Sequence, residues 1–93
     1  MKPEIEKSLI MSTGHISKKD GDRLNSIDPS DLIVDNYSFG WRILVTDINL
    51  TKLTKTFSHG FIAAILFAKK NNCEWLQLDG DGPEYGFLKT YDW

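Results

Sequence analysis

Alternating apolar and polar residues predict strands at 8–13, 32–35, 41–47 and 74–79. The clearest is the third, WRILVTD, in which Trp41, Ile43 and Val45 point to one face and their neighbours to the other. Residues 36–40, with a glycine at their end, are typical of a hairpin connection between the second and third strands. The pattern therefore favours a small β-sheet.

A long apolar run predicts the strongest helix, at 58–71. Ser58 supplies an N-cap, two lysines complement the helix dipole at the far end, and Asn71 or Asn72 can supply the left-handed residue that ends the helix. Apolar residues surround nearly the whole cylinder, more than a two-layer domain covers. We therefore expect either the connection 48–57 or a second protein chain to cover its outer side.

A second helix is predicted at 18–27. Ser17 is its N-cap, Asp20 stands three residues later as in a capping box, and the Asp-Pro pair at 28–29 ends the helix. Gly21 lies inside this helix and costs about 1 kcal/mol relative to alanine, which makes the helix the weaker of the two.

The order of strands and helices is typical of an α+β two-layer sandwich of the ferredoxin-like βαββαβ kind. In that arrangement two helices cover one face of an antiparallel sheet, and the first and third strands run parallel at its centre. Residues 87–93 are expected to add a C-terminal strand or hairpin. A chain of 93 residues and 10.6 kDa suits one domain, 1–93, in which we expect residues 1–7 to form a flexible N-terminal arm.

This topology brings His15, Asp47 and His59 to one edge of the sheet. Two histidines and a carboxylate are a known metal-ligand set, so a metal site, a small-ligand site or an enzyme at this edge is one alternative. No motif spacing joins the three residues, and we favour a protein without catalytic residues, metal or other cofactor. Asp79 and Asp81 would lie at the opposite edge, in a sharp acidic turn whose following residues do not fit a calcium loop.

The charge of the chain disfavours a dedicated nucleic-acid binder. Eleven Lys and Arg against thirteen Asp and Glu give a net charge of −2 and a pI near 5.6. An RNA-recognition-like alternative rests on Phe39-Gly40-Trp41, which opens a strand, because such domains stack bases on strand aromatics. We favour core packing for Trp41.

Cysteine usage and hydropathy favour a cytoplasmic protein. Cys73 is the one cysteine, which excludes an intrachain disulfide. The chain starts without a signal-peptide pattern, and its longest apolar run is too short to span a bilayer, so we expect no membrane partner.

Short motifs follow one another along the chain: STGHI at 12–16, FGW at 39–41, NCEW at 72–75, DGDGP at 79–83 and TYDW at 90–93. With these motifs the chain resembles the uncharacterised domain-of-unknown-function family 5983. It departs from the family pattern at Gly14, Phe39 and Asn72, where the family carries alanine, tyrosine and glycine. The resemblance implies a bacterial, phage or plasmid setting and brings no established activity, cofactor or site residues.

We therefore expect a small non-enzymatic accessory protein of a mobile element that binds a host or phage protein and modulates or inhibits it, a defence protein being one such target. Interface cores favour aromatic side chains. The expected interaction residues are Phe61, Ile62, Phe67, Tyr85, Phe87, Tyr91 and Trp93. Two other uses of these residues stay open, packing within the domain's own core and a homodimer formed through the apolar helix.

Overall fold

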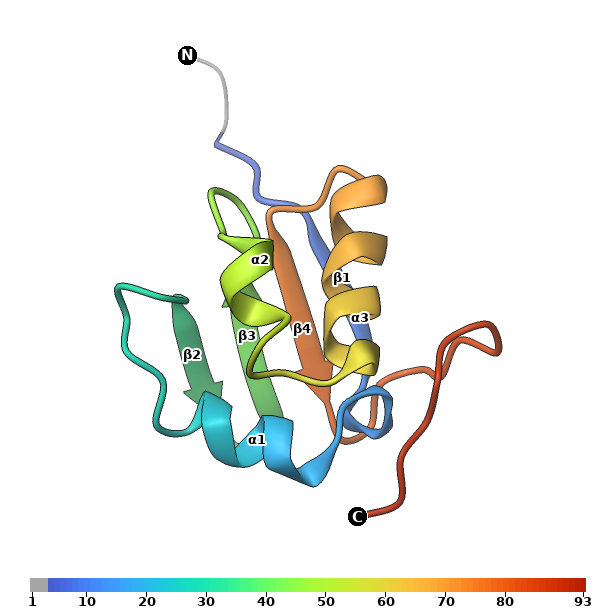
Figure 1. Ribbon diagram of the computed structural model, residues 1–93. Helices are drawn as coiled ribbons and strands as arrows, with labels where there is room; N and C mark the ends of the chain where they lie inside the picture. Colours follow the sequence, from blue (N-terminus) through green and yellow to red (C-terminus); the bar gives the residue numbers. More distant parts are fainter. Residues whose placement is uncertain (1–3) are drawn as a thin grey trace.

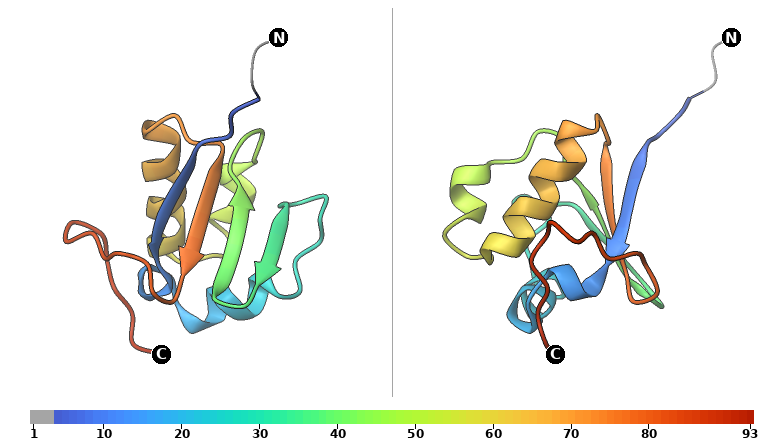
Figure 2. Two further views of the ribbon diagram at one scale, coloured as in Figure 1. Left: turned by 180° about the vertical axis from the view of Figure 1, so that it is seen from behind. Right: turned by 90° about the vertical axis from the view of Figure 1, so that its right-hand side faces the viewer.

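The computed structural model describes residues 4–93 and contains a four-stranded mixed sheet and three α-helices (Figure 1). The strands are β1 (Ser8–Ser12), β2 (Val34–Tyr37), β3 (Gly40–Leu44) and β4 (Trp75–Asp79). The helices are α1 (Lys18–Leu24), α2 (Leu50–Leu53) and α3 (His59–Lys70), and a 3₁₀ turn spans Thr13–His15. Within this part of the chain, α2 and α3 lie on one face of the sheet and no helix covers the other (Figure 2). The predicted α+β class is confirmed.

The strand order is β1-β4-β3-β2, which differs from the ferredoxin-like arrangement. β1 pairs in parallel with β4, from Ser8 opposite Trp75 to Ser12 opposite Asp79, and β3 is antiparallel to both β4 and β2. The prediction of parallel first and third strands at the centre is wrong, because β1 lies at an edge and runs opposite to β3. Apolar alternation distinguishes the two faces of a strand but does not specify its neighbours.

The core lies between the sheet and α3. Ile43 of β3 and Val45 beyond it are fully buried, as are Leu76 and Leu78 of the neighbouring β4. From the helix side Phe61 is equally buried. Burial of each such side chain contributes about 1.5–3 kcal/mol, so this layer supplies much of the fold's stability.

Both predicted helix starts are confirmed, and one carboxylate joins them. At α1, the Asp20 N–H donates to Ser17 Oγ at 3.1 Å, and Asp20 Oδ2 accepts from the Ser17 N–H at 2.8 Å. At α3, Ser58 Oγ accepts from the Phe61 N–H at 3.2 Å. The Asp20 carboxylate is buried and also accepts from the N–H and the hydroxyl of Ser58, at 2.9 and 2.5 Å. It therefore holds the starts of α1 and α3 together.

The helix ends agree with the sequence to within a few residues. Asn72, which follows the C-cap Asn71 of α3, takes a left-handed conformation with φ at 58°. α1 ends at Leu24, three residues before the predicted Ile27. None of the helices in residues 4–93 has the length and apolar character needed to cross a bilayer.

The connection 48–57 contains α2, a short helix that the sequence did not predict. Leu53 is buried, and the ring of Phe57 stacks on that of Phe61 with centroids 4.2 Å apart. The connection thus contacts the first turn of α3 through Phe57, but farther along the helix Ile62, Ala63 and Leu66 still line an open hollow, so the connection does not cover the outer side as one of the two expected alternatives required. It leaves Leu66 exposed.

Residues 80–93, here called the C-terminal segment, contain no strand or helix, so the predicted C-terminal strand is wrong. The segment leaves β4 and passes along the outer edge of β1 (Figure 2). The Ser12 N–H donates to the Pro83 carbonyl at 2.8 Å, and the Tyr85 hydroxyl donates to the Ile10 carbonyl at 3.1 Å. The segment therefore pairs with edge groups of β1 without continuing the sheet.

Part of the predicted N-terminal arm is attached to the sheet. Residues 1–3 lie outside the described residues. The Lys7 N–H donates to Glu74 Oε2 at 2.6 Å, and Lys7 Nζ donates to the Asn71 carbonyl at 2.7 Å. The chain is thus held to the body from residue 7 onward.

Candidate interaction site: an aromatic pocket at the end of the sheet

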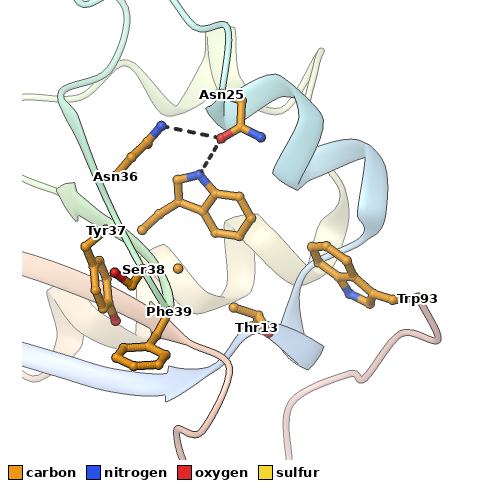
Figure 3. A pocket seen from close by; sticks show the side chains of 9 residues that line it. Thr13, Asn25, Asn36, Tyr37, Ser38, Phe39 and Trp93 are labelled. Atoms are coloured by element: carbon orange, nitrogen blue, oxygen red, sulfur yellow. Dashed lines mark hydrogen bonds between the residues drawn. The ribbon is translucent and has the colours of Figure 1, made fainter.

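A pocket of about 380 Å³ lies where the β2–β3 hairpin approaches the end of the chain (Figure 3). We call it the aromatic pocket, because Tyr37, Phe39, Trp41 and Trp93 line it. The rest of its wall consists of Thr13, Asn25, Asn36, Ser38 and Gly40, so no lining side chain carries a formal charge. Phe39 is 61% exposed and Trp93 is 58% exposed, which leaves much of both rings open to solvent.

Trp41 is held in the pocket wall by one hydrogen bond, to Asn25. It lies on the same side of β3 as Ile43, as the alternation predicted, and is half-buried. Its Nε1–H donates to Asn25 Oδ1 at 3.0 Å, and the same oxygen accepts from Asn36 Nδ2 at 3.5 Å (Figure 3). Asn25 caps the end of α1. The ring is therefore tied both to α1 and to β2.

Trp93 reaches the pocket because glycine occupies the helix beneath it. Its Nε1–H donates to the Ile16 carbonyl at 3.0 Å, and its ring centroid lies 6.4 Å from that of Trp41. A Cβ on Gly21 would lie 2.8 Å from Cη2 of Trp93 and 3.0 Å from Cη2 of Trp41. The glycine that weakens α1 thus allows both indole rings to approach its backbone.

We predict that Gly21→Ala moves Trp93 away from the pocket. The added methyl group improves helix propensity by about 1 kcal/mol but overlaps Trp93, so the net gain in stability falls below that value. Denaturant unfolding measures the stability, and the Trp93 indole N–H resonance in an NMR spectrum reports the ring. Gly86→Ala is the control, because no atom lies within 4 Å of its added methyl group. A full gain in stability with an unmoved Trp93 resonance would contradict the prediction.

A carboxylate lies beside the pocket. The Tyr37 hydroxyl donates to Asp79 Oδ2 at 3.0 Å and accepts from Gln77 Nε2 at 3.2 Å. Partial burial raises the pKa of Tyr37; the Gln77 hydrogen bond opposes this, and the nearby Asp79 adds to it. The Gly80 N–H donates to the Phe39 carbonyl at 2.8 Å, which holds the acidic turn against the hairpin. An uncharged pocket therefore borders negative charge.

The C-terminal segment that carries Trp93 is anchored by a buried histidine. His15 is fully buried, its Nε2 accepts from the Tyr85 N–H at 2.9 Å, and its Nδ1 lies 2.8 Å from the Lys89 carbonyl. Because Nε2 accepts a hydrogen bond, the proton of this neutral ring is on Nδ1, which donates to Lys89. The Tyr91 N–H adds a bond to the Gly14 carbonyl at 2.8 Å. His15 therefore positions the segment.

The structure does not bring His15, Asp47 and His59 together. β1 and β3 run in opposite directions, so His15 and Asp47 follow strands that end at opposite ends of the sheet. His59 is exposed at the start of α3, at the His15 end. Asp79 pairs with Ser12 at that same end, so the prediction that Asp79 and Asp81 lie at the opposite edge is also wrong. Residues 4–93 contain no group of three His, Cys, Asp or Glu able to hold a metal ion.

Two of the predicted interaction residues stabilise the fold. Phe61 is fully buried in the core. The Tyr91 hydroxyl accepts from the Gly60 N–H at 3.1 Å, and a Cβ on Gly60 would lie 2.5 Å from the Tyr91 ring. Both side chains are thus engaged within the chain.

The other predicted interaction residues lie at three places. One place is a cluster of Phe67, on α3, with Tyr85 and Phe87 of the C-terminal segment. The ring centroid of Phe67 lies 5.3 Å from that of Tyr85 and 4.9 Å from that of Phe87. Phe87 is 69% exposed. Ile62 lines a hollow of about 260 Å³ between α3 and Thr54, and Trp93 lies in the aromatic pocket.

The RNA-recognition-like alternative requires its aromatic side chains on the open face of the sheet, and Trp41 does not lie there. It lies on the face of the sheet that the helices cover. The open face carries Trp75 instead, whose ring lies 4.2 Å from the Arg42 guanidinium, together with the carboxylates of Asp35 and Asp79. Negative charge on this face disfavours a phosphate backbone.

No pattern in the sequence singled out Tyr37, Asn25 and Asn36 as site residues, and Phe39 was considered only for base stacking. One signal was available. Residues 36–39 (NYSF) place two aromatic side chains in a short polar hairpin, which offers too little surrounding chain to bury both of them. Nothing in the sequence near these residues indicates that they come close to Trp93 in the fold.

The comparisons with known proteins identify a family and no individual relative. A family model described as "Family of unknown function (DUF5983) C-terminal domain" matches residues 8–93, the region that holds every motif of the resemblance. No curated protein and no solved structure matches the chain.

Proposed function

Because the chain belongs to the DUF5983 family, whose function is unknown, we propose a function from its geometry. It is a small non-enzymatic protein that binds a partner protein through the aromatic pocket. The exposure of Phe39 and Trp93, at 61% and 58% on a concave uncharged surface, is the observation that carries this proposal. Aromatic side chains around a pocket are typical of the few residues that dominate protein interfaces.

The aromatic pocket suits a partner better than the second aromatic cluster does. Phe87 already packs edge-on against Phe67, at 4.9 Å between ring centroids. Phe39 has one aromatic neighbour, Tyr37, at 6.4 Å, and its ring borders a hollow that a partner side chain can fill. Filling the hollow removes apolar surface from water on both sides.

The setting implied by the family narrows the proposed partner. That setting is bacterial, phage or plasmid, so we propose a host or phage protein as the partner that this small protein contacts. Binding of the chain would modulate or inhibit a larger protein assembly in the cytoplasm, for example one that belongs to a defence system.

Capture with matched variants tests this proposal. The full chain is immobilised as wild type, Phe39→Ala and Phe87→Ala, and each is exposed to the same bacterial lysate. Both replaced rings are largely exposed, so neither change is expected to alter folding. We expect a stoichiometric protein partner on the wild type and on Phe87→Ala, and about tenfold less of it on Phe39→Ala.

Three outcomes would contradict the proposal. Loss of the partner from Phe87→Ala alone would move the interface to the cluster on α3 and the C-terminal segment. Equal capture by all three forms, or repeated failure to recover any stoichiometric protein, would remove the pocket from the interaction.

A further inference from the structure

Resting on the proposed function, we infer that the side chain of the partner that enters the aromatic pocket is an arginine. The pocket offers aromatic faces and oxygen acceptors, it contains no positive charge, and negative charge lies at its border. Each of these properties follows from contacts between described residues, and together they select a planar cation with many N–H donors.

The two indole rings present their π-systems and not their N–H groups. The Nε1–H of Trp41 is engaged by Asn25 Oδ1 at 3.0 Å, and that of Trp93 by the Ile16 carbonyl at 3.0 Å. A ligand in the pocket therefore meets ring faces and edges, with Phe39 at the rim. Ring faces attract cations through their quadrupole, and tryptophan does so most strongly.

The surrounding charge favours a cation over an anion. No side chain in the pocket wall is charged, and the Tyr37 hydroxyl, on the open-face side of the pocket, contacts the Asp79 carboxylate at 3.0 Å. The Gly80 N–H donates to the Phe39 carbonyl at 2.8 Å, and Asp81, which is exposed, is the next residue of this turn. A cationic side chain gains from this negative charge, whereas a phosphate or a partner carboxylate is repelled.

Arginine fits these surroundings better than lysine. Its guanidinium group is planar and weakly hydrated, so it can stack on an aromatic ring while its edge donates to oxygens. Ser38, Thr13 and Asn36 supply hydroxyl and amide oxygens in the pocket wall. On the open face of the sheet the chain itself makes such a contact, with the Arg42 guanidinium 4.2 Å from the Trp75 ring centroid.

Three short peptides test the inference on the full ¹⁵N-labelled chain by NMR. Each is an acetylated, amidated tripeptide with alanine on both sides of arginine, lysine or citrulline; citrulline has the shape of arginine without its charge. We expect the arginine peptide to shift the Trp93 and Trp41 indole N–H resonances and the Asn36 side-chain amide. The indole of Trp75, on the open face of the sheet, serves as the internal reference. Citrulline and lysine should bind at least about fivefold more weakly.

Variants and a second probe make the result decisive. Phe39→Ala should reduce the arginine-peptide shifts at least about fivefold, and Phe87→Ala should leave them unchanged. Equal binding of citrulline, shifts unaffected by Phe39→Ala, or no shift up to about 10 mM peptide would overturn the inference. Tighter binding of a thymidine oligonucleotide at the same resonances would replace it with base stacking. If Phe39→Ala loses the captured partner while the arginine peptide does not bind, the proposed function stands and this inference falls.

Discussion

Replacing His15 by alanine is expected to lower the free energy of unfolding by about 3–5 kcal/mol and to detach the C-terminal segment. The imidazole is fully buried and bonds two backbone groups of the segment, the Tyr85 N–H at 2.9 Å and the Lys89 carbonyl at 2.8 Å. Alanine leaves both groups without these partners and opens a cavity where the ring was. Because Trp93 ends the same segment, the aromatic pocket should lose that wall as well.

Denaturant unfolding and amide hydrogen exchange measure the two effects of His15→Ala separately. The exchange of the Tyr85 and Tyr91 amides should accelerate more than that of the core strands. His59→Ala is the matched control, because His59 is exposed, and it should change stability by less than about 0.5 kcal/mol. A His15→Ala protein with unchanged stability and a protected Tyr85 amide would show that the ring does not anchor the segment.

Asp20→Asn is expected to cost about 2–3 kcal/mol although it preserves the size of the side chain. The carboxylate accepts three hydrogen bonds, one from the Ser17 N–H and two from Ser58. The asparagine side chain has only one oxygen to accept these bonds. Its NH₂ group would lie where the second carboxylate oxygen was and would face an N–H or hydroxyl donor there. The loss should affect the starts of α1 and α3 together, since the same side chain serves both.

Thermal or denaturant unfolding checks this value against Asp22→Asn, an exposed carboxylate on the same helix that should change stability by less than about 0.5 kcal/mol. Asp20→Asn also has a local readout, because the Ser58 amide resonance should move. Equal stabilities of the two variants would show that the bridge between the helix starts contributes nothing.

Local features of this fold were predictable from the sequence because their causes lie within a few residues. Ser17 and Asp20 have capping-box spacing, Asn72 tolerates a left-handed backbone, and the alternation from Trp41 onward identified the buried side of β3. Each of these predictions is confirmed by the structure.

Long-range features were not predictable in the same way. Alternation in 8–13 fits an edge strand and a central strand equally, and the parallel pairing with β4 depends on chain 67 residues away, as between Ser8 and Trp75. The aromatic ending of the chain suggested a strand, but the Tyr91 and Trp93 side chains each make a single hydrogen bond to a separate part of the body. The contacts of His15 were unpredictable for the same reason, since Tyr85 and Lys89, which bond its ring, lie 70 and 74 residues from it.

The candidate site combines both kinds of feature. Trp93 was expected to contact a partner because of its place in an aromatic ending, whereas Phe39 was considered only for base stacking. The pocket exists because Gly21 lets Trp93 and Trp41 approach α1 and because the hairpin carries Phe39 to the same end of the sheet. No pattern in the sequence indicates that these three aromatic side chains lie around one pocket.

Photo-crosslinking in cells tests the central claim, binding through the aromatic pocket, most directly. A photoreactive aromatic residue replaces Phe39 in one form, Phe39→p-benzoylphenylalanine, and Phe87 in another, Phe87→p-benzoylphenylalanine, so that both forms keep a ring at the substituted position. The account predicts one dominant protein adduct from position 39 and little or none from position 87. An adduct from position 87 alone, or none from either position in bacterial cells that express the protein, would contradict it.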